Sequence, residues 1–157
     1  MIRLSQLVLK NGIFLDVEAQ TQVGVLERIT GCLVEAGIVD RDDQSELLTR
    51  LTEREKLCST AVGHGAAIPH AYFDKLKTPM VVVCRTQQPI DFCAPDGDRV
   101  DLIFVLLGPK RVPAQHIQIL SRIARMLKDE QFDNQLRHAH EPDEVLAALQ
   151  DVEKRHH

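Results

Sequence analysis

The sequence predicts an α/β domain in which helices pack on both sides of a β-sheet. Two stretches, 78–84 and 100–107, are continuous runs of β-branched and other apolar residues, as is typical of strands covered on both faces. Stretches whose apolar residues recur every three or four positions lie before and after them, as in amphipathic helices. Because strands and helices alternate along the chain, we expect a layered α/β architecture.

A first strand and a pair of helices are expected ahead of the two apolar runs. Residues 13–17 are rich in apolar and β-forming residues, and Thr21 is a suitable N-cap for a helix that follows this strand. A second helix is expected over 40–56, where Asp43 and Glu46 have the spacing of a capping pair.

The segment between the two apolar runs is expected to be a loop, and the rest of the chain to be helical. Residues 94–98 include proline, aspartate and glycine, which are turn residues. A helix is expected to begin near Pro113, followed by helices over 129–137 and 142–153, because apolar residues recur there at helical spacing.

Length and composition favour one domain with a hydrophobic core. The 157 residues are 44% hydrophobic, and no internal repeat, low-complexity segment or linker divides them. We expect a single domain over 1–157, with residues 154–157 disordered and the final histidine pair without a functional role. The N-terminus has no long apolar segment, so we expect neither a signal peptide nor membrane insertion, and a cytoplasmic protein.

Charge and cysteine usage narrow the classes of partner and compartment. The net charge is −4, with 19 Lys and Arg against 23 Asp and Glu, which lacks the basic footprint of a nucleic-acid-binding protein and suits a basic protein partner. The cysteines are far apart and form no C-x-x-C pair, so four reduced thiols are expected. They are Cys32, Cys58, Cys84 and Cys93.

The segment 54–70 concentrates the residues that can carry chemistry. Pro69 fixes its own φ and biases Ile68 towards an extended conformation, which narrows the directions in which His70 can project. A neutral imidazole is a suitable nucleophile near physiological pH. The glycines in Gly63–Gly65 permit backbone N–H groups to turn towards an anion. We therefore expect His70 to be a nucleophile beside an anion-binding loop.

The pattern R-E-x-x-x-S-T-x-x-G-x-G-x-A-I-P-H over 54–70 resembles the IIA component of the phosphoenolpyruvate-dependent sugar phosphotransferase system, of the fructose, mannitol and nitrogen-regulatory type. The similarity continues through 89–92, 100–107 and 116–120, so it covers nearly all of the chain. It implies a mixed sheet flanked by helices on both faces, the mannitol/fructose-type IIA fold. A chain that carries no IIB or IIC segment is most similar to the nitrogen-regulatory branch.

The resemblance also implies a site centred on His70, the residue that is phosphorylated at its Nε2 (tele) nitrogen in this family. It implies that His116 is a hydrogen-bonding partner and that Arg54 stabilises the phosphoryl oxygens, a role for which its planar charge is well suited. The remaining residues expected around the phosphoryl group are Ser59, Thr60, Gly63, His64 and Gly65.

Two further assignments have open alternatives. His64, at a position that often holds asparagine in the family, is either an additional donor to the phosphoryl group or an exposed side chain that faces a partner. Ala71, Tyr72 and Phe73 are candidates for the rim of a partner-binding surface, because aromatic side chains anchor interfaces well. The alternative is that both aromatic rings pack onto the sheet.

The expected function is phosphoryl transfer without a metal or other cofactor. A histidine phosphocarrier protein of the HPr type is implied as the donor, and a IIB component or regulated targets, such as regulators of potassium transport, as the next partners. One alternative is a IIA subunit of a fructose- or galactitol-type sugar transporter. A remote alternative is a zinc site formed by Cys58, His64, His70 and His116. The chain has no G-x-x-x-x-G-K-[ST] loop, so the phosphoryl donor is expected to be a protein rather than a nucleotide.

Overall fold

A six-stranded mixed sheet forms the centre of the structure, which is a computed structural model that describes residues 2–156. The strands are β1 (Val8–Val17), β2 (Ala61–Gly63), β3 (Ala66–Ala67), β4 (His70–Tyr72), β5 (Met80–Ile90) and β6 (Val100–Gly108). Their order is β1-β5-β6-β3-β2, and β4 pairs with β6 as well. Strands β5 and β6 are antiparallel, whereas β1 is parallel to β5, and β3 and β4 are parallel to β6.

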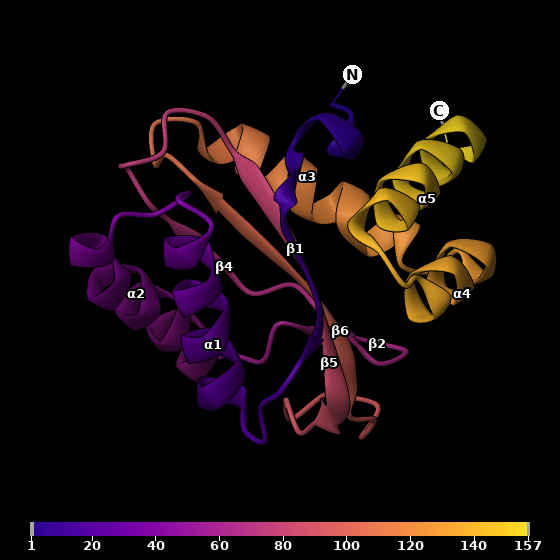
Figure 1. The fold of residues 1–157 in the computed structure, drawn as a ribbon, viewed down its shortest axis with the longest axis horizontal. Coiled ribbons are helices and arrows are strands. Elements are labelled where there is room, and N and C mark those ends of the chain that lie inside the picture. Colours follow the sequence, from indigo (N-terminus) through magenta and orange to yellow (C-terminus); the bar gives the residue numbers. More distant parts are fainter. Residues whose placement is uncertain (1, 157) are drawn as a thin grey trace.

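Helices cover both faces of this sheet, which confirms the predicted α/β class. They are α1 (Gln22–Glu35), α2 (Gln44–Leu57), α3 (Pro113–Met126), α4 (Glu130–His138) and α5 (Pro142–Arg155), with short 3-10 turns at Leu4–Gln6 and Arg41–Asp43. Figure 1 shows α1 and α2 together on one side of the sheet and α3, α4 and α5 on the other. Within residues 2–156, no helix has the length and apolar character needed to cross a membrane.

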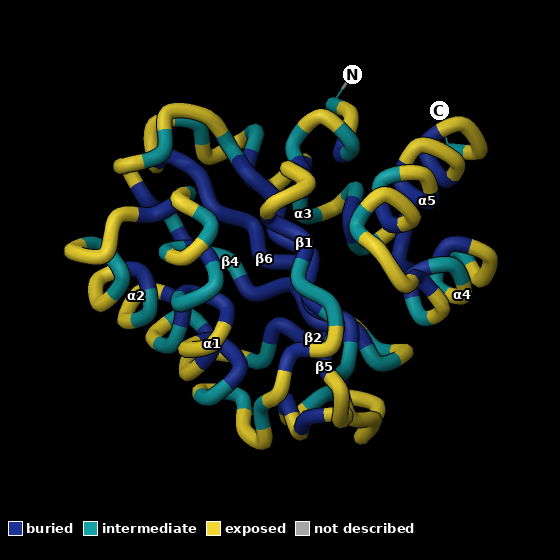
Figure 2. Tube along the Cα trace, in the orientation of Figure 1, coloured by how far each residue is buried: buried dark blue, intermediate teal, exposed yellow. Residues whose placement is uncertain are grey.

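The unbroken apolar run 102–107 within β6 follows from burial on both faces, whereas Asp101 near the start of the strand is only half-buried and pairs with Arg137. Leu102, Phe104 and Leu106 pack into the core that contains the apolar faces of α3, α4 and α5. Ile103 and Val105 alternate with them and pack into the second core, against α1 and α2. Figure 2 shows the result as a buried central sheet between helices that are each exposed along one side. A strand with period-two side chains and two covered faces has no position for a polar residue.

The starts of the first two helices differ in how they are capped. Thr21 caps α1 as predicted, since its hydroxyl accepts a hydrogen bond of 2.9 Å from the Gly24 N–H. The predicted capping pair of Asp43 and Glu46 is wrong, because the side chain of Asp43 makes no capping hydrogen bond. The 3-10 turn at Arg41–Asp43 leads directly into α2, so Asp43 already has a helical backbone (φ −97°, ψ −6°) and its carboxylate is not placed as an N-cap.

Three short strands in the motif region were not expected from the sequence. Strands β2, β3 and β4 have two or three residues each, and they are built mainly from alanine, glycine and histidine rather than β-branched residues. Their extended conformation is set by pairing with β6 and with each other. Local propensity is weak in such segments, and tertiary pairing decides their structure.

The described part of the C-terminal segment is helical and is hydrogen-bonded to the start of α4. Helix α5 continues to Arg155, and Nε2 of His156 lies 2.7 Å from the Asp129 carboxylate. Asp129 also accepts hydrogen bonds from Arg155 and from the Phe132 N–H. The structure thus joins Arg155 and His156 to the residue that caps α4, while the expected disorder of 154–157 stays a prediction and residue 157 lies outside the described residues.

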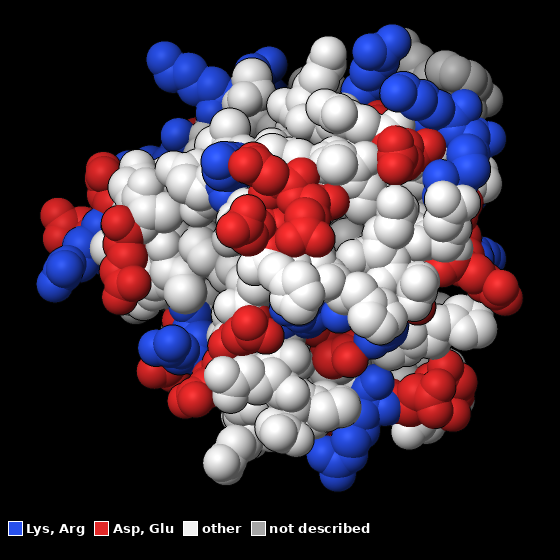
Figure 3. Space-filling model, turned by 45° about the vertical axis from the view of Figure 1, so that its right-hand side comes forward, with Lys and Arg blue, Asp and Glu red and all other residues white. Residues whose placement is uncertain are grey.

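Charged side chains are spread over the surface in small groups. On the face shown in Figure 3, acidic and basic groups alternate and are separated by uncharged surface. That face therefore shows no continuous basic stripe, in agreement with the near balance of 19 basic and 23 acidic residues.

The aromatic residues that follow His70 have different environments. Phe73 is 2% exposed and packs into the core against α1 and α2, so it belongs to the core and not to a binding rim. Its N–H also donates to the Gly108 carbonyl at 2.8 Å. Tyr72 is half-buried, and its ring lies 4.8 Å from that of His116. Of this pair, only Tyr72 remains available to a partner.

We therefore expect Phe73→Ala to act on stability rather than on binding. Loss of a fully buried phenylalanine side chain should lower the free energy of unfolding by about 3 to 5 kcal/mol. Urea denaturation at low temperature measures this, with Tyr72→Ala as the half-buried control that should cost less. A Phe73→Ala protein as stable as the unmodified chain would contradict the core assignment.

Candidate functional site

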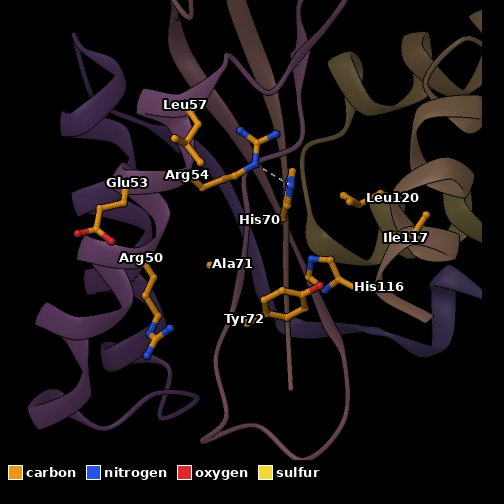
Figure 4. A pocket seen from close by; sticks show the side chains of 10 residues that line it. All are labelled: Arg50, Glu53, Arg54, Leu57, His70, Ala71, Tyr72, His116, Ile117 and Leu120. Atoms are coloured by element: carbon orange, nitrogen blue, oxygen red, sulfur yellow. Dashed lines mark hydrogen bonds between the residues drawn. The ribbon is translucent and has the colours of Figure 1, made fainter. Parts of the chain in front are cut away.

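The backbone that leads into His70 is fixed on both sides of Pro69. The Ile68 N–H donates to the Thr60 carbonyl at 3.0 Å, and the Leu106 N–H donates to the Pro69 carbonyl at 2.9 Å. His70 then begins β4 and pairs with Leu106 of β6. With φ of Pro69 restricted and these bonds in place, His70 has one direction in which to project. Figure 4 shows its ring in the space between α2 and α3.

The two ring nitrogens of His70 have different partners, and these define its tautomer. Nδ1 lies 2.8 Å from the Ile68 carbonyl oxygen, which can only accept a hydrogen bond. Nε2 lies 3.1 Å from Nε of Arg54, which can only donate. Both contacts require the neutral ring with its proton on Nδ1 and a lone pair on Nε2. The ring nitrogen of His70 that has a lone pair for chemistry is therefore Nε2.

Arg54 is positioned by the end of its own helix. It lies in the last turn of α2, and its Nη1 donates to the Cys58 carbonyl at 2.8 Å while its Nε reaches His70. The guanidinium thus stands over the lone pair of His70, where it can donate to the oxygens of an incoming anion. The structure thus places Arg54 beside His70, while its expected role at the phosphoryl oxygens stays a prediction.

The predicted third member of the site, His116, lies on the opposite wall. It is 5% exposed near the start of α3, and its ring centroid is 5.7 Å from that of His70. Burial, reinforced by the neighbouring His70, lowers the pKa of His116 to about 4. Burial is also the main cause that lowers the pKa of His70, and the charge of Arg54 adds to it. Both imidazoles are consequently neutral at pH 7.

A groove of about 560 Å³ opens in front of these residues, between α2 and α3 (Figure 4). Its lining residues are Arg50, Glu53, Arg54, Leu57, His70, Ala71, Tyr72, His116, Ile117 and Leu120. Leu57 and Ile117 are 82% and 61% exposed, so each wall presents an apolar side chain to solvent. Exposed apolar residues on both sides of a polar centre are typical of a surface that receives another protein.

Sequence reasoning missed Leu57, Ile117 and Leu120 as groove residues. A usable signal was present in the sequence, because Leu57 closely follows Arg54 and Ile117 directly follows His116. An apolar residue next to a residue assigned to the site is a candidate for its rim. The apolar periodicity of the helices hid this signal, since leucine and isoleucine there are normally assigned to the core.

The hydroxyl groups of Ser59 and Thr60 do not fit the expected role of phosphoryl donors. The Ser59 hydroxyl donates to the Phe92 carbonyl and accepts from the Ala61 N–H at 3.1 Å. The Thr60 hydroxyl is buried and donates to the carboxylate of Glu55. A hydroxyl has one hydrogen, and each of these hydrogens is already used within the protein. Both residues nevertheless line a second cavity that also borders Arg54 and His70.

Glu55 is a further residue near the site that the sequence analysis did not single out. Its carboxylate is 8% exposed, and burial raises its pKa even though Thr60 donates to it. Its place directly after Arg54 in the motif was the available signal. Burial of a carboxylate lowers the stability of the fold unless its oxygens accept hydrogen bonds. The hydrogen bonds that Glu55 accepts therefore indicate a structural role for this side chain.

The Gly63–Gly65 segment forms a tight turn that lies outside the groove. Gly63 pairs with Ala66, and the two residues between them, His64 and Gly65, have positive φ values of 57° and 77°. This is the geometry of a two-residue hairpin connection, for which Asn-Gly is the favoured sequence. This backbone conformation accounts for the asparagine that the family resemblance implies at position 64.

The amide and carbonyl groups of this turn are bound to other parts of the protein. The His64 N–H donates to the Asp96 carboxylate at 3.2 Å, and the His64 carbonyl accepts from Arg137 at 2.8 Å. Arg137 in turn pairs with Asp101 and Asp133. The expected anion-binding loop of Gly63, His64 and Gly65 is therefore not assembled next to His70; these residues connect β2 to β3.

The described residues also bear on the zinc alternative. Within residues 2–156, no group of three or more His, Cys, Asp or Glu side chains is close enough to hold a metal ion. Of the four residues considered, the structure brings together only His70 and His116 as lining residues of one groove. All four cysteines are free.

The chain belongs to the EIIA type-2 family of the phosphotransferase system. The family model described as "Phosphoenolpyruvate-dependent sugar phosphotransferase system, EIIA 2" matches residues 6–152. This result confirms the resemblance that the motif over 54–70 indicated, and it identifies the protein as a IIA component of a phosphotransfer system.

The similarity to curated relatives favours the nitrogen-regulatory branch of this family. The chain is 42% identical over 99 residues to the "Nitrogen regulatory protein" of Bradyrhizobium diazoefficiens, a match that spans 63% of this chain and 65% of that relative. It is 35% identical to the protein of the same name from Pseudomonas aeruginosa, over 98% of both chains. It is also 36% identical to the "PTS system fructose-specific EIIA component" of Haloferax volcanii, over 89% of this chain and 90% of that relative.

Solved structures agree with this assignment. The crystal structure of "Nitrogen Regulatory Protein IIA-Ntr from Neisseria meningitidis" superposes with a TM-score of 0.82 at 31% identity, over 92% of this chain and 97% of that chain. The mannitol IIA of Escherichia coli, in a complex with phosphorylated IIB, superposes with a TM-score of 0.70 at 26% identity, over 90% of this chain and 95% of that chain. The nitrogen-regulatory assignment is thus favoured over a sugar-specific IIA.

We predict that His64→Asn leaves phosphoryl transfer unchanged and stabilises the fold. Asparagine adopts positive φ more readily than histidine, so the free energy of unfolding should rise by up to about 1 kcal/mol. Chemical denaturation measures the stability, and the rate of phosphorylation and lifetime of the phosphoprotein measure the function. His64→Val, with a β-branched side chain at the same position, should destabilise. A slower transfer in His64→Asn would instead restore His64 as a phosphoryl donor.

The lowered pKa of His116 predicts how stability depends on pH. The unfolded chain binds a proton at this side chain below its usual pKa of 6.5, whereas the folded protein does so only near pH 4. Stability contributed by the neutral ring is therefore complete above pH 6.5 and is lost as the pH falls towards 4. NMR titration of the ring C–H signals should show this midpoint, and His116→Gln should weaken the pH dependence. A midpoint near 6.5 would contradict the prediction.

Proposed function

We propose that His70 accepts a phosphoryl group from the phosphohistidine of a carrier protein of the HPr type. The observation that supports this most directly is the pair of contacts on opposite ring nitrogens, which leave Nε2 as the nucleophile. In the transfer step, Nε2 attacks phosphorus and forms the new N–P bond while the N–P bond to the carrier's histidine breaks. The Nδ1 proton stays in place, and the Ile68 carbonyl stabilises the positive charge that develops on the ring.

Arg54 has two successive tasks in this mechanism. In the structure its Nε donates to Nε2 of His70, so the lone pair is occupied until a donor arrives. The same N–H group must release the ring as phosphorus approaches, and it then lies beside the phosphoryl oxygens. A guanidinium donates to such oxygens with several N–H groups at once, which stabilises the charge in the transition state.

His116 completes the site as a hydrogen-bonding partner of the phosphoryl group. It is neutral in the free protein because burial lowers its pKa to about 4. A phosphoryl dianion on the neighbouring His70 favours the protonated form of His116, so phosphorylation raises this pKa. The ring then donates to the group that it faces.

The groove between α2 and α3 receives the carrier and the downstream partner. Support comes from the exposed side chains of Leu57 and Ile117, which border His70 on both walls, and from Tyr72 at the base. A related IIA protein of this fold forms a complex with a phosphorylated IIB protein. Such docking allows a phosphoryl group to pass between two histidines, or a histidine and a cysteine, without a metal cofactor.

We further propose a regulatory role in the cytoplasm, where the phosphorylation state controls binding to target proteins such as regulators of potassium transport. Nitrogen-regulatory relatives at 35% and 42% identity favour this branch. The second candidate is a IIA subunit for a fructose- or galactitol-type transporter, favoured by the 36% identity to a fructose-specific component. Permease genes beside the gene for this chain would support transport, and nitrogen-regulation genes would support control.

The central test is labelling by phosphoenolpyruvate, the first enzyme of the pathway and its carrier protein. We expect one acid-labile phosphate, mapped to His70, and no label in His70→Ala. His116→Ala and Arg54→Gln should each slow transfer about 100-fold, as expected when one donor to a developing charge is removed.

His138→Ala is the matched control, because this exposed histidine lies outside the groove and should leave labelling unchanged. Circular dichroism confirms that each variant is folded. Label on a residue other than His70, or no label from any carrier, would contradict the proposed function.

A further inference from the structure

Glu55 accepts hydrogen bonds from two segments of the protein. One carboxylate oxygen accepts from the Thr60 hydroxyl, and the other accepts from the Thr60 N–H at 3.1 Å and from Nε2 of Gln22 at 2.9 Å. Gln22 begins α1, and Thr60 follows the end of α2. The buried carboxylate thus joins the start of α1 and the residue before β2 to the last turn of α2.

A chain of hydrogen bonds continues from this carboxylate to the nucleophile. Thr60 is held by Glu55 on its N–H and hydroxyl sides, and its carbonyl accepts from the Ile68 N–H at 3.0 Å. The Ile68 carbonyl then accepts from Nδ1 of His70 at 2.8 Å. Glu55 is therefore linked to His70 through Thr60 and Ile68, and the Ile68 carbonyl is the group that keeps the proton on Nδ1 of His70.

The same carboxylate is adjacent to the residue that contacts the other ring nitrogen. Arg54 directly precedes Glu55 in α2 and donates to Nε2 of His70. Movement of Glu55 would shift the helix end that carries Arg54 and, through Thr60, the strand entry that carries His70. The Glu55 side chain thus helps to position both Arg54 and His70, the two residues that contact each other.

We propose that Glu55 is a positioning residue for phosphoryl transfer, and that it keeps His70 in the tautomer with a proton on Nδ1 and none on Nε2. This inference rests on the proposed function of His70. It also assigns Thr60 a role as the intermediary between Glu55 and Ile68, in place of the expected contact with the phosphoryl group. Neither residue touches the transferred group.

A carboxylate meets this requirement and an amide does not. Glu55 receives three donors on two oxygens, and an ionised carboxylate has acceptor sites for all of them. In Glu55→Gln, the new NH₂ group can face only the Thr60 hydroxyl oxygen, because the other oxygen of the side chain is needed by the Thr60 N–H and by Gln22. The Thr60 hydroxyl must then accept instead of donate, and its buried hydrogen loses its acceptor, so the link between residue 55 and Thr60 is weakened.

The test combines a tautomer measurement with a transfer measurement. In Glu55→Gln, the ¹⁵N NMR shifts of the His70 ring should move from the Nδ1-protonated form towards a mixture of tautomers. The transfer rate from the carrier should fall about 10- to 100-fold, because misplacement of reacting groups has effects of this size. Glu27→Gln removes the same charge from an exposed position on α1, and it should change neither property.

A second pair of variants keeps the inference testable if Glu55→Gln does not fold. Thr60→Val removes the hydroxyl donor but keeps the N–H, whereas Thr60→Ser restores the hydroxyl. We expect the valine variant to show the tautomer shift and slower transfer, and the serine variant to behave like the unmodified protein. Equal behaviour of the two, or an unchanged tautomer and rate in a folded Glu55→Gln protein, would overturn the inference.

The two proposals can fail separately. If no carrier phosphorylates the unmodified protein, the proposed function is wrong, and the NMR shifts still show whether Glu55 sets the tautomer. If His70 is phosphorylated at equal rates with and without Glu55 in folded proteins, the positioning role is wrong and the proposed function stands.

Discussion

The hydrogen bond from Nδ1 of His70 to the Ile68 carbonyl determines what this site can do. An imidazole in water exchanges its proton between two nitrogens, and a carbonyl, which can only accept, keeps the proton on the nitrogen that faces it. At 2.8 Å the Ile68 carbonyl is such a partner, and the restricted φ of Pro69 between the two residues limits the backbone that carries the ring. The lone pair of Nε2 is consequently directed at Arg54 and the groove. Without this bond, only the contact with Arg54 would favour this tautomer.

Burial keeps both histidines in the chemically useful form. His70 is half-buried at the edge of the sheet and His116 is almost fully buried on α3, so the charged form of each is disfavoured. Arg54 supplies a fixed positive charge beside the neutral ring of His70. In the proposed function, the neutral ring attacks phosphorus and the permanent cation stabilises the phosphoryl oxygens, two roles that exposed histidines near their usual pKa would not keep separate.

The motif contains residues of two kinds that a linear sequence does not distinguish. His70 and Arg54 contact each other in the groove, whereas Ser59 and Thr60 use their hydroxyl hydrogens inside the protein. Gly63–Gly65 is required by the positive φ values of a tight turn. A glycine-rich segment shortly before a histidine resembles an anion-binding loop in sequence, but the direction of its N–H groups depends on the strand pairing around it. Here the His64 N–H is directed at Asp96.

The sequence by itself determined the α/β class, the two central strands and the main helices, while its resemblance to the family indicated Arg54 and His116 as partners of a phosphorylated His70, which stays a prediction. Apolar periodicity and a long motif carry that information locally, because side-chain burial follows the period of each element. Only the tertiary structure decided the short strands β2, β3 and β4, the apolar rim formed by Leu57 and Ile117, and the internal roles of Ser59, Thr60 and Glu55. These depend on which groups meet across the sheet and between helices, since a hydroxyl, a carboxylate or a two-residue strand takes its function from its partner rather than from its neighbours in the chain.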